Sequence, residues 1–144
     1  MTDIKKADWD DKYLLGIPMI DAQHKKLVKL INALYDIATG DEATYKLQMS
    51  KVLKALTDYT IYHFADEEQF MTKYGYHSTD THKIAHTSFI NEIHAQIRRL
   101  GTGDQKEGLH LYQYLINWLY MHIGKADPIW ANFVKPKLPV NERG

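Results

Sequence analysis

The 144-residue chain contains no cysteine, which excludes several kinds of site at the outset. Without thiols the chain cannot form a disulfide, hold an iron–sulfur cluster or build a zinc site from thiolates. Any metal must therefore be bound by nitrogen and oxygen atoms. Long apolar runs are also missing: the most apolar stretch, residues 109–123, is too short to span a membrane and carries four polar side chains.

The chain has no net charge either. Its 18 Lys and Arg residues balance 18 Asp and Glu residues, so there is no basic footprint for nucleic acid or for an anionic membrane surface. The first six residues lack the apolar core of a secretion signal, which favours a cytoplasmic location. We expect one soluble domain over residues 1–144, present as a monomer and inserted in no membrane.

Turn-forming residues divide the sequence into a short lead-in and four long segments. Glycine, proline and aspartate mark the boundaries near residues 16–18, 40–41, 75–80, 101–104 and 128. In all four segments the apolar positions recur in steps of three and four, as they do on one face of a helix. The sequence predicts an all-α fold, an antiparallel up-and-down four-helix bundle over about residues 19–134. An N-terminal arm over about residues 1–18 precedes it, and a tail over about residues 135–144 follows.

Two aspartates stand near predicted helix starts. Asp21 and Asp41 are each placed to cap the N-terminus of a helix, the first and the second of the bundle.

Histidine is unusually frequent, with eight residues in the chain. Five of them fall on the inward-facing positions of the predicted helices, together with one glutamate. These residues are His24, His63, His82, His86, His122 and Glu67. A buried imidazole or carboxylate is costly unless it is paired or bound to a metal. So many in one layer of a bundle favour a metal site over a set of separately hydrogen-bonded core histidines.

The spacing of these residues supports a metal site. His63 and Glu67 are four residues apart, and so are His82 and His86, which puts each pair on one helix face with Cβ atoms about 5–6 Å apart. Side chains at this separation can bind one metal or a close pair of metals. One such pair arises often by chance, whereas two pairs with inward histidines on both remaining helices are far more specific.

Asp127 is harder to interpret from its spacing. It lies five residues after His122, and on an ideal helix the two side chains would point about 140° apart. A π-type turn would bring them together, and Gly124 and Pro128 suit a helix that distorts and ends there. The spacing leaves two interpretations open, a further metal ligand or a solvated residue at the end of the helix.

Four short motifs carry a resemblance to a known family. They are residues 20–24 (IDAQH), 63–68 (HFADEE), 82–86 (HKIAH) and 122–127 (HIGKAD). In order and spacing they resemble the ligand motifs of the hemerythrins, and of single-domain bacteriohemerythrins in particular, from about Trp9 to Phe133. The sequence departs from the family pattern at residues 128–130 (PIW), where relatives often carry polar residues, and at residues 76–77 (YH), where Tyr-Pro is frequent.

The resemblance implies a non-haem di-iron site with a bridging oxo or hydroxo group. It implies that one iron is held by His82, His86 and His122 and the other by His24 and His63, while Glu67 and Asp127 bridge the two. Asp127 is thereby implied to be a ligand. If both irons are six-coordinate, this ligand count leaves one position open, on the iron with two histidines. A single open position suits a small diatomic ligand such as dioxygen.

The resemblance also implies an apolar pocket for that ligand. Leu27, Leu119 and Ile123 match the family's pocket positions, and Phe64 and Trp118 are candidates to complete the wall. Ordinary core packing places apolar residues at the same positions, and the two roles are compatible. Reversible binding needs such a dry pocket, because water or protons would release the oxygen in reduced form and leave the irons oxidised.

Three functions from different classes compete for this site. We favour reversible dioxygen binding for carriage, storage or delivery, with an oxygen-consuming enzyme or a reductant as further partner and no enzymatic activity. A ferritin-like di-iron oxidase or ferroxidase would need two Glu-x-x-His pairs and two further glutamates, and the chain has one such pair, Glu107 with His110. Sensing of oxygen or redox state through the same site is the other alternative, which we expect to need an output domain.

Overall fold

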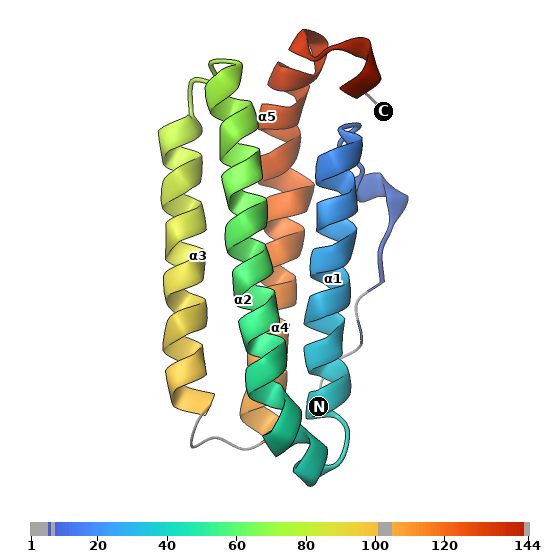
Figure 1. Cartoon of the computed structure of the whole chain (residues 1–144), viewed down its shortest axis with the longest axis vertical. Helices are drawn as coiled ribbons and strands as arrows, with labels where there is room; N and C mark the ends of the chain where they lie inside the picture. The colour runs from blue at the N-terminus through green and yellow to red at the C-terminus, as the bar shows by residue number, and fades with distance from the viewer. Residues whose placement is uncertain (1–5, 7, 101–104, 143–144) are drawn as a thin grey trace.

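Four long helices form an antiparallel bundle in the computed structural model. The structure describes residues 6, 8–100 and 105–142, with the backbone alone at residues 99–100. The helices are α1 (Pro18–Ala38), α2 (Glu42–Lys73), α3 (Thr79–Leu100) and α4 (Gln105–Met121). Each runs opposite to the one before it (Figure 1). Helices α2 and α4 both pack against α1 and against α3. The predicted all-α four-helix fold is confirmed.

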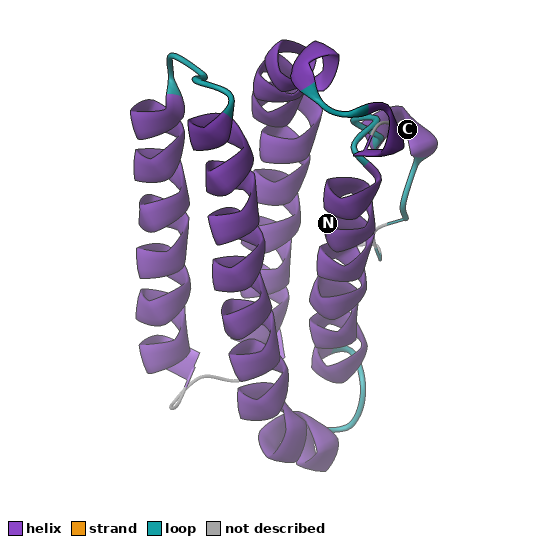
Figure 2. Ribbon diagram, turned by 45° about the horizontal axis from the view of Figure 1, so that its top comes forward, coloured by secondary structure: helices purple, strands orange, loops and turns teal. Residues whose placement is uncertain are grey.

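Shorter helical pieces flank the bundle. A π-helical turn, His122–Ala126, joins α4 to α5 (Asp127–Val134), and single 3₁₀ turns occur at Asp11–Tyr13, Lys135–Lys137 and Val140–Glu142. The helices are joined by short loops (Figure 2), and there is no strand in the described part of the chain. Within the same ranges, no helix combines the length and the apolar character needed to cross a membrane.

The start of α1 differs from the prediction that Asp21 caps it. The helix begins at Pro18, because proline fits the first helical turn, where its missing N–H has no partner to lose. Asp21 lies inside that turn, and its carboxylate accepts hydrogen bonds from the backbone N–H groups of Leu15 (2.7 Å) and Gly16 (3.1 Å). Gly16 has φ +84°, which a residue with a side chain rarely adopts. Asp21 therefore holds the lead-in against the bundle, whereas Asp41 caps α2 as predicted.

The end of α4 also differs from the prediction. The expected π-type turn is present, since the N–H of Asp127 bonds to the carbonyl oxygen of His122, five residues back. The expected termination at Pro128 is wrong, because the helix continues as α5 to Val134. Pro128 lies in the first turn of α5, directly after the distorted turn, where a proline is tolerated.

The core consists of two apolar clusters separated by a polar layer. Along α1, Ile20 belongs to one cluster and Leu27 to the other, and His24 lies between them. Along α2, Phe64 and Met71 flank Glu67 in the same way. The predicted inward histidines therefore lie inside the bundle, closed off above and below by apolar side chains.

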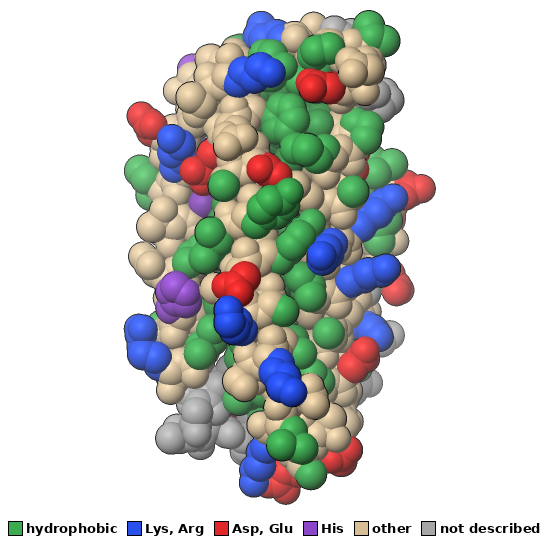
Figure 3. Space-filling model, in the orientation of Figure 1, with side chains coloured by type: hydrophobic (Ala, Val, Ile, Leu, Met, Phe, Trp, Pro, Cys, Tyr) green, Lys and Arg blue, Asp and Glu red, His purple; other side chains and the backbone are tan. Residues whose placement is uncertain are grey.

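Charged side chains of both signs are interspersed over the face seen in Figure 3, and neither sign gathers into a single patch there. This distribution agrees with the balanced composition of the chain.

Candidate metal centre

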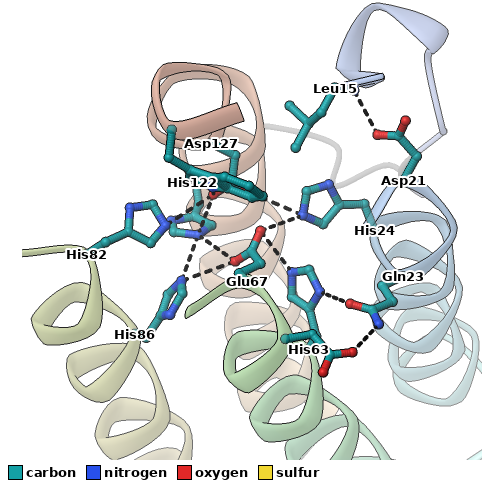
Figure 4. A network of polar contacts seen from close by, with 12 residues as sticks. Leu15, Asp21, Gln23, His24, His63, Glu67, His82, His86, His122 and Asp127 are labelled. Atoms are coloured by element: carbon teal, nitrogen blue, oxygen red, sulfur yellow. Dashed lines mark hydrogen bonds and ion pairs between the residues drawn. The ribbon is translucent and has the colours of Figure 1, made fainter. Parts of the chain in front are cut away.

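Seven polar residues from all parts of the bundle meet in the layer between the two apolar clusters (Figure 4). They come from α1 (His24), α2 (His63, Glu67), α3 (His82, His86), the π-helical turn (His122) and the start of α5 (Asp127). None of the seven is more than 8% exposed. These are the residues that the sequence assigned to metal binding, and the structure brings all of them together.

Three histidines surround one oxygen of each carboxylate. Glu67 Oε1 lies 3.2 Å from His86 Nε2 and 3.6 Å from His122 Nε2. Asp127 Oδ1 lies 3.0 Å from His122 Nε2 and 3.2 Å from His82 Nε2. We call these three nitrogens and two oxygens the three-histidine group.

The other two histidines surround the remaining oxygen of each carboxylate. His24 Nε2 lies 3.2 Å from both Glu67 Oε2 and Asp127 Oδ2, and His63 Nε2 lies 3.3 Å from Glu67 Oε2. We call these two nitrogens and two oxygens the two-histidine group. Each carboxylate thus directs one oxygen into each group. The two groups lie side by side, and the three-histidine group offers five possible metal-ligand atoms while the two-histidine group offers four.

The electrostatics of the layer favour ionised carboxylates. Burial acts to raise the pKa of Glu67, but the charge of His63 and hydrogen bonds from His122 and His24 hold that pKa well below its usual range. Burial and the charge of Glu67 act to raise the pKa of Asp127, yet His122 and His24 hold it below its usual range as well. The layer therefore carries two negative charges that require positive partners.

Those positive partners are protons as long as no metal is bound. Burial opposes protonation of His24, but hydrogen bonds and charge from Asp127 and Glu67 outweigh it and raise the pKa of His24 to about 9. The same two carboxylates outweigh burial at His122 and raise its pKa to about 10. A metal cation would take the place of these protons, since metal binding requires neutral imidazoles.

Several buried nitrogen and oxygen atoms of the layer lack a well-formed hydrogen bond to any described residue. His63 Nε2, His82 Nε2, Glu67 Oε1 and Asp127 Oδ2 are buried, and each lies 3.2–3.6 Å from an imidazole or carboxylate neighbour without the geometry of a well-formed hydrogen bond. Such orphaned polar atoms are costly inside a protein. One ligand atom each from Glu67 and the three histidines of the three-histidine group lie within 4.8 Å of one another, and so do those of Glu67, His24 and His63. The residues present therefore fit two neighbouring metal ions.

The π-helical turn determines the position of Asp127. With five residues between the hydrogen-bonded groups instead of four, the turn brings the carboxylate of Asp127 to 3.0 Å from His122 Nε2. Asp127 is fully buried, so it is not the solvated helix-end residue that the spacing also allowed.

Three further residues, which the sequence did not predict, make hydrogen bonds at the site. Gln23 lies between His63 and Asp66, Glu68 accepts from His86 Nδ1 at 2.8 Å, and the indole N–H of Trp130 donates to Asp127 Oδ1 at 3.0 Å. Gln23 and Glu68 each stand next to a predicted ligand in the sequence. Neighbours along a helix face different directions, however, so helical spacing alone gave no reason to select them.

The apolar residues predicted for an oxygen pocket all lie close to this layer. Leu27, Leu119 and Ile123 are buried members of the apolar cluster that also contains Phe64. The ring of Phe64 stacks on His86 with centroids 3.7 Å apart, and Trp118 stacks on His122 at 4.5 Å. Phe64 and Trp118 thus contact the three-histidine side of the layer, and a role for these five residues in binding oxygen stays a prediction.

Fold and site together define a four-helix bundle whose buried layer of histidines and carboxylates fits a metal site. Comparison with known proteins identifies the family. Residues 15–133 match the family model described as the hemerythrin HHE cation binding domain. The chain belongs to the hemerythrin family, and its site is a non-haem iron site.

Relatives and solved structures agree with this assignment. The chain is 35% identical over 127 residues to a bacteriohemerythrin of Pseudomonas aeruginosa strain PAO1, an alignment that covers 88% of this chain and 80% of the relative. It is 28% identical over 121 residues to a bacteriohemerythrin of Clostridium acetobutylicum, covering 83% and 94% of the two chains. The crystal structure of a leucine-to-alanine mutant of a hemerythrin superposes with a TM-score of 0.73 at 27% identity, covering 89% of this chain and 96% of the other.

Proposed function

We propose that this protein binds dioxygen reversibly at a non-haem di-iron centre, for the carriage, storage or delivery of oxygen. One observation carries the proposal. Glu67 and Asp127 each place one oxygen in the three-histidine group and the other oxygen in the smaller two-histidine group. A pair of carboxylates that serves both groups suits a pair of metal ions, and the smaller group has room for a ligand from outside the protein.

The residues of the chain hold the two positions in place. Glu67 and Asp127 connect the two groups and so fix the distance between them, and five imidazoles supply the remaining ligand atoms. An iron pair bound there would supply two electrons to dioxygen and recover them on release. The protein must keep this exchange reversible, which requires that water be kept out of the layer.

Apolar packing supplies that exclusion. Leu27, Phe64, Leu119 and Ile123 are each at most 4% exposed and lie on one side of the layer. A second cluster, which includes Ile20, Met71 and Trp130, closes the other side. Buried apolar side chains thus flank the layer in these two directions.

The donor set favours binding over enzymatic oxidation, and we propose that the protein is not an enzyme. Five imidazoles and two carboxylates surround the two positions, whereas a ferritin-like oxidase site is rich in carboxylates. The single Glu-x-x-His pair does not join the site: Glu107 and His110 line a surface pocket with Gln96 and Tyr114, and none of these residues belongs to either group.

Oxygenation can be tested directly on the iron-loaded protein. The protein is reduced without air, exposed to dioxygen and then purged, while its visible absorption is recorded through several cycles. We expect a charge-transfer band that appears with dioxygen and disappears on purging, and that a Glu67→Ala variant fails to produce. Irreversible oxidation in the first cycle would contradict the proposal and favour an oxidase or a redox sensor.

A further inference from the structure

A chain of two hydrogen bonds connects His63 to a carboxylate outside the metal layer. His63 Nδ1 lies 2.7 Å from Gln23 Oε1, and Gln23 Nε2 donates to Asp66 Oδ2, also at 2.7 Å. Gln23 comes from α1 and is 5% exposed, while His63 and Asp66 come from α2 and Asp66 is only partly buried. Figure 4 shows the amide of Gln23 facing the ring of His63 on the side away from Glu67. A surface carboxylate is thus linked to a buried ring in two steps.

The direction of these bonds follows from the chemistry of the three groups. A carboxylate only accepts hydrogen bonds, so the Gln23 amide must turn its NH₂ towards Asp66. Its carbonyl oxygen then faces His63 and can only accept, so His63 Nδ1 must carry a hydrogen. Metal binding requires a neutral imidazole, which has one N–H, so in that state Nε2 is left with its lone pair free. That nitrogen belongs to the two-histidine group.

Among the described residues, Asp66 is the acceptor that holds the NH₂ of Gln23. Without that acceptor, Gln23 could turn over and present its NH₂ to His63 Nδ1, which would favour the tautomer with the hydrogen on Nε2. An imidazole in that form cannot bind a metal through Nε2. We propose that Asp66 is a positioning residue which, by orienting Gln23, keeps His63 in the tautomer that binds metal. This inference rests on the metal binding in the proposed function.

Loss of Asp66 should weaken metal binding at only one of the two metal positions, the one served by His63. On the other side of the layer, His86 is oriented directly by Glu68, without an intervening amide. The two-histidine group also has fewer protein donors, so it depends more strongly on each of them. Loss of an outer partner of a metal-binding histidine typically lowers metal affinity about 10- to 100-fold.

Metal titration of Asp66 variants tests the proposal. The metal-free protein is titrated with Fe²⁺ under anaerobic conditions, and separately with Zn²⁺, and the bound equivalents are counted after dialysis against a chelator. We expect wild type to retain two equivalents. Asp66→Ala should retain one and bind the second about 10- to 100-fold more weakly.

Two further variants separate positioning from a structural role. Asp66→Asn keeps the size of the side chain, but its amide can donate as well as accept, so it no longer fixes the direction of the Gln23 amide and should weaken the second equivalent as Asp66→Ala does. Asp58→Ala removes an exposed carboxylate of the same helix that pairs with Lys54, and it should bind both equivalents as wild type does. Circular dichroism of each metal-free variant checks that the bundle is folded.

The possible outcomes separate this inference from the proposed function. Two equivalents bound by Asp66→Ala with wild-type affinity would overturn the positioning role while leaving the di-iron proposal intact. Equal weakening of both equivalents, or wild-type binding by Asp66→Asn, would also overturn the positioning role. A wild-type protein that binds no metal would overturn both.

Discussion

Buried polar residues in this protein are held by specific partners, and the indole of Trp130 is an instructive case. Its ring is fully buried in the apolar cluster beyond the metal layer, and its N–H donates to Asp127 Oδ1 at 3.0 Å. Asp127 Oδ1 therefore has one partner that is not a histidine. Trp130 both fills the core and restricts the rotation of a carboxylate that we propose to bind metal.

Trp130→Phe tests this dual role. The substitution removes the donor and part of a buried ring, so we expect the free energy of unfolding of the metal-free protein to fall by about 1–3 kcal/mol. Urea unfolding followed by circular dichroism measures this change. The matched control is Trp9→Phe, because the Trp9 indole donates to Asp11 at 3.1 Å on the surface. That control should lose less stability than Trp130→Phe, because the Trp9 ring is only partly buried against the core and its hydrogen bond is exposed, and an equal loss in the two variants would refute a special role for Trp130.

At the scale of helices, the segment from α4 to α5 places two site residues through an unusual turn. The turn His122–Ala126 contains one residue more than an α-helical turn would use to connect His122 with Asp127. Four α-helical residues rotate about 400° and rise about 6 Å, which also brings two side chains to one face. The π-helical turn thus behaves as a one-residue insertion that leaves both ends of the segment in helical register.

This interpretation predicts that removing one residue from the turn is tolerated. We expect deletion of Gly124, made together with Pro128→Ala, to keep the bundle folded with two metal equivalents bound. The second change is needed because a proline inside the resulting continuous helix would cost about 3 kcal/mol. Metal content and thermal unfolding measure the outcome, with Pro128→Ala alone as the background.

Deletion of Asn117 from α4 serves as the control. Asn117 is exposed on a regular part of the helix, so its removal would rotate all that follows by about 100°. This variant should lose metal. If the Gly124 deletion loses metal to the same extent, the π-helical turn itself is required.

Helical elements were also the features that the sequence predicted best. Steps of three and four between apolar residues are a property of a single helix, and they predicted both the bundle and the inward positions of histidines such as His24. Contacts between helices have no such period. Gln23 and Asp66, for example, meet only because α1 packs against α2. The ends of helices depend on local geometry in a similar way, so Pro128 was predicted to stop a helix that continues past it.

At the scale of the whole molecule, stability is linked to what occupies the metal layer. In the metal-free protein the pKa of His24 is about 9 and that of His122 about 10, both above the ordinary value of 6.5. Between those values the folded protein holds protons that the unfolded chain has released, so their stabilising effect is complete below about pH 6.5 and is lost as the pH rises. The lowered pKa values of Glu67 and Asp127 act at the other end, where stability is lost as the pH falls below their ordinary range near 4.

A bound metal should reverse the alkaline part of this dependence. Metal ions bind the deprotonated imidazoles, so raising the pH removes competing protons and leaves the loaded protein at least as stable. We therefore expect the melting temperature of the metal-free protein to fall between pH 6 and pH 9, while that of the loaded protein stays level or rises. Both forms share the same surface groups, so the difference between the two curves isolates the metal layer. Parallel curves would show that His24 and His122 exchange no protons for metal, and would count against metal binding by this layer.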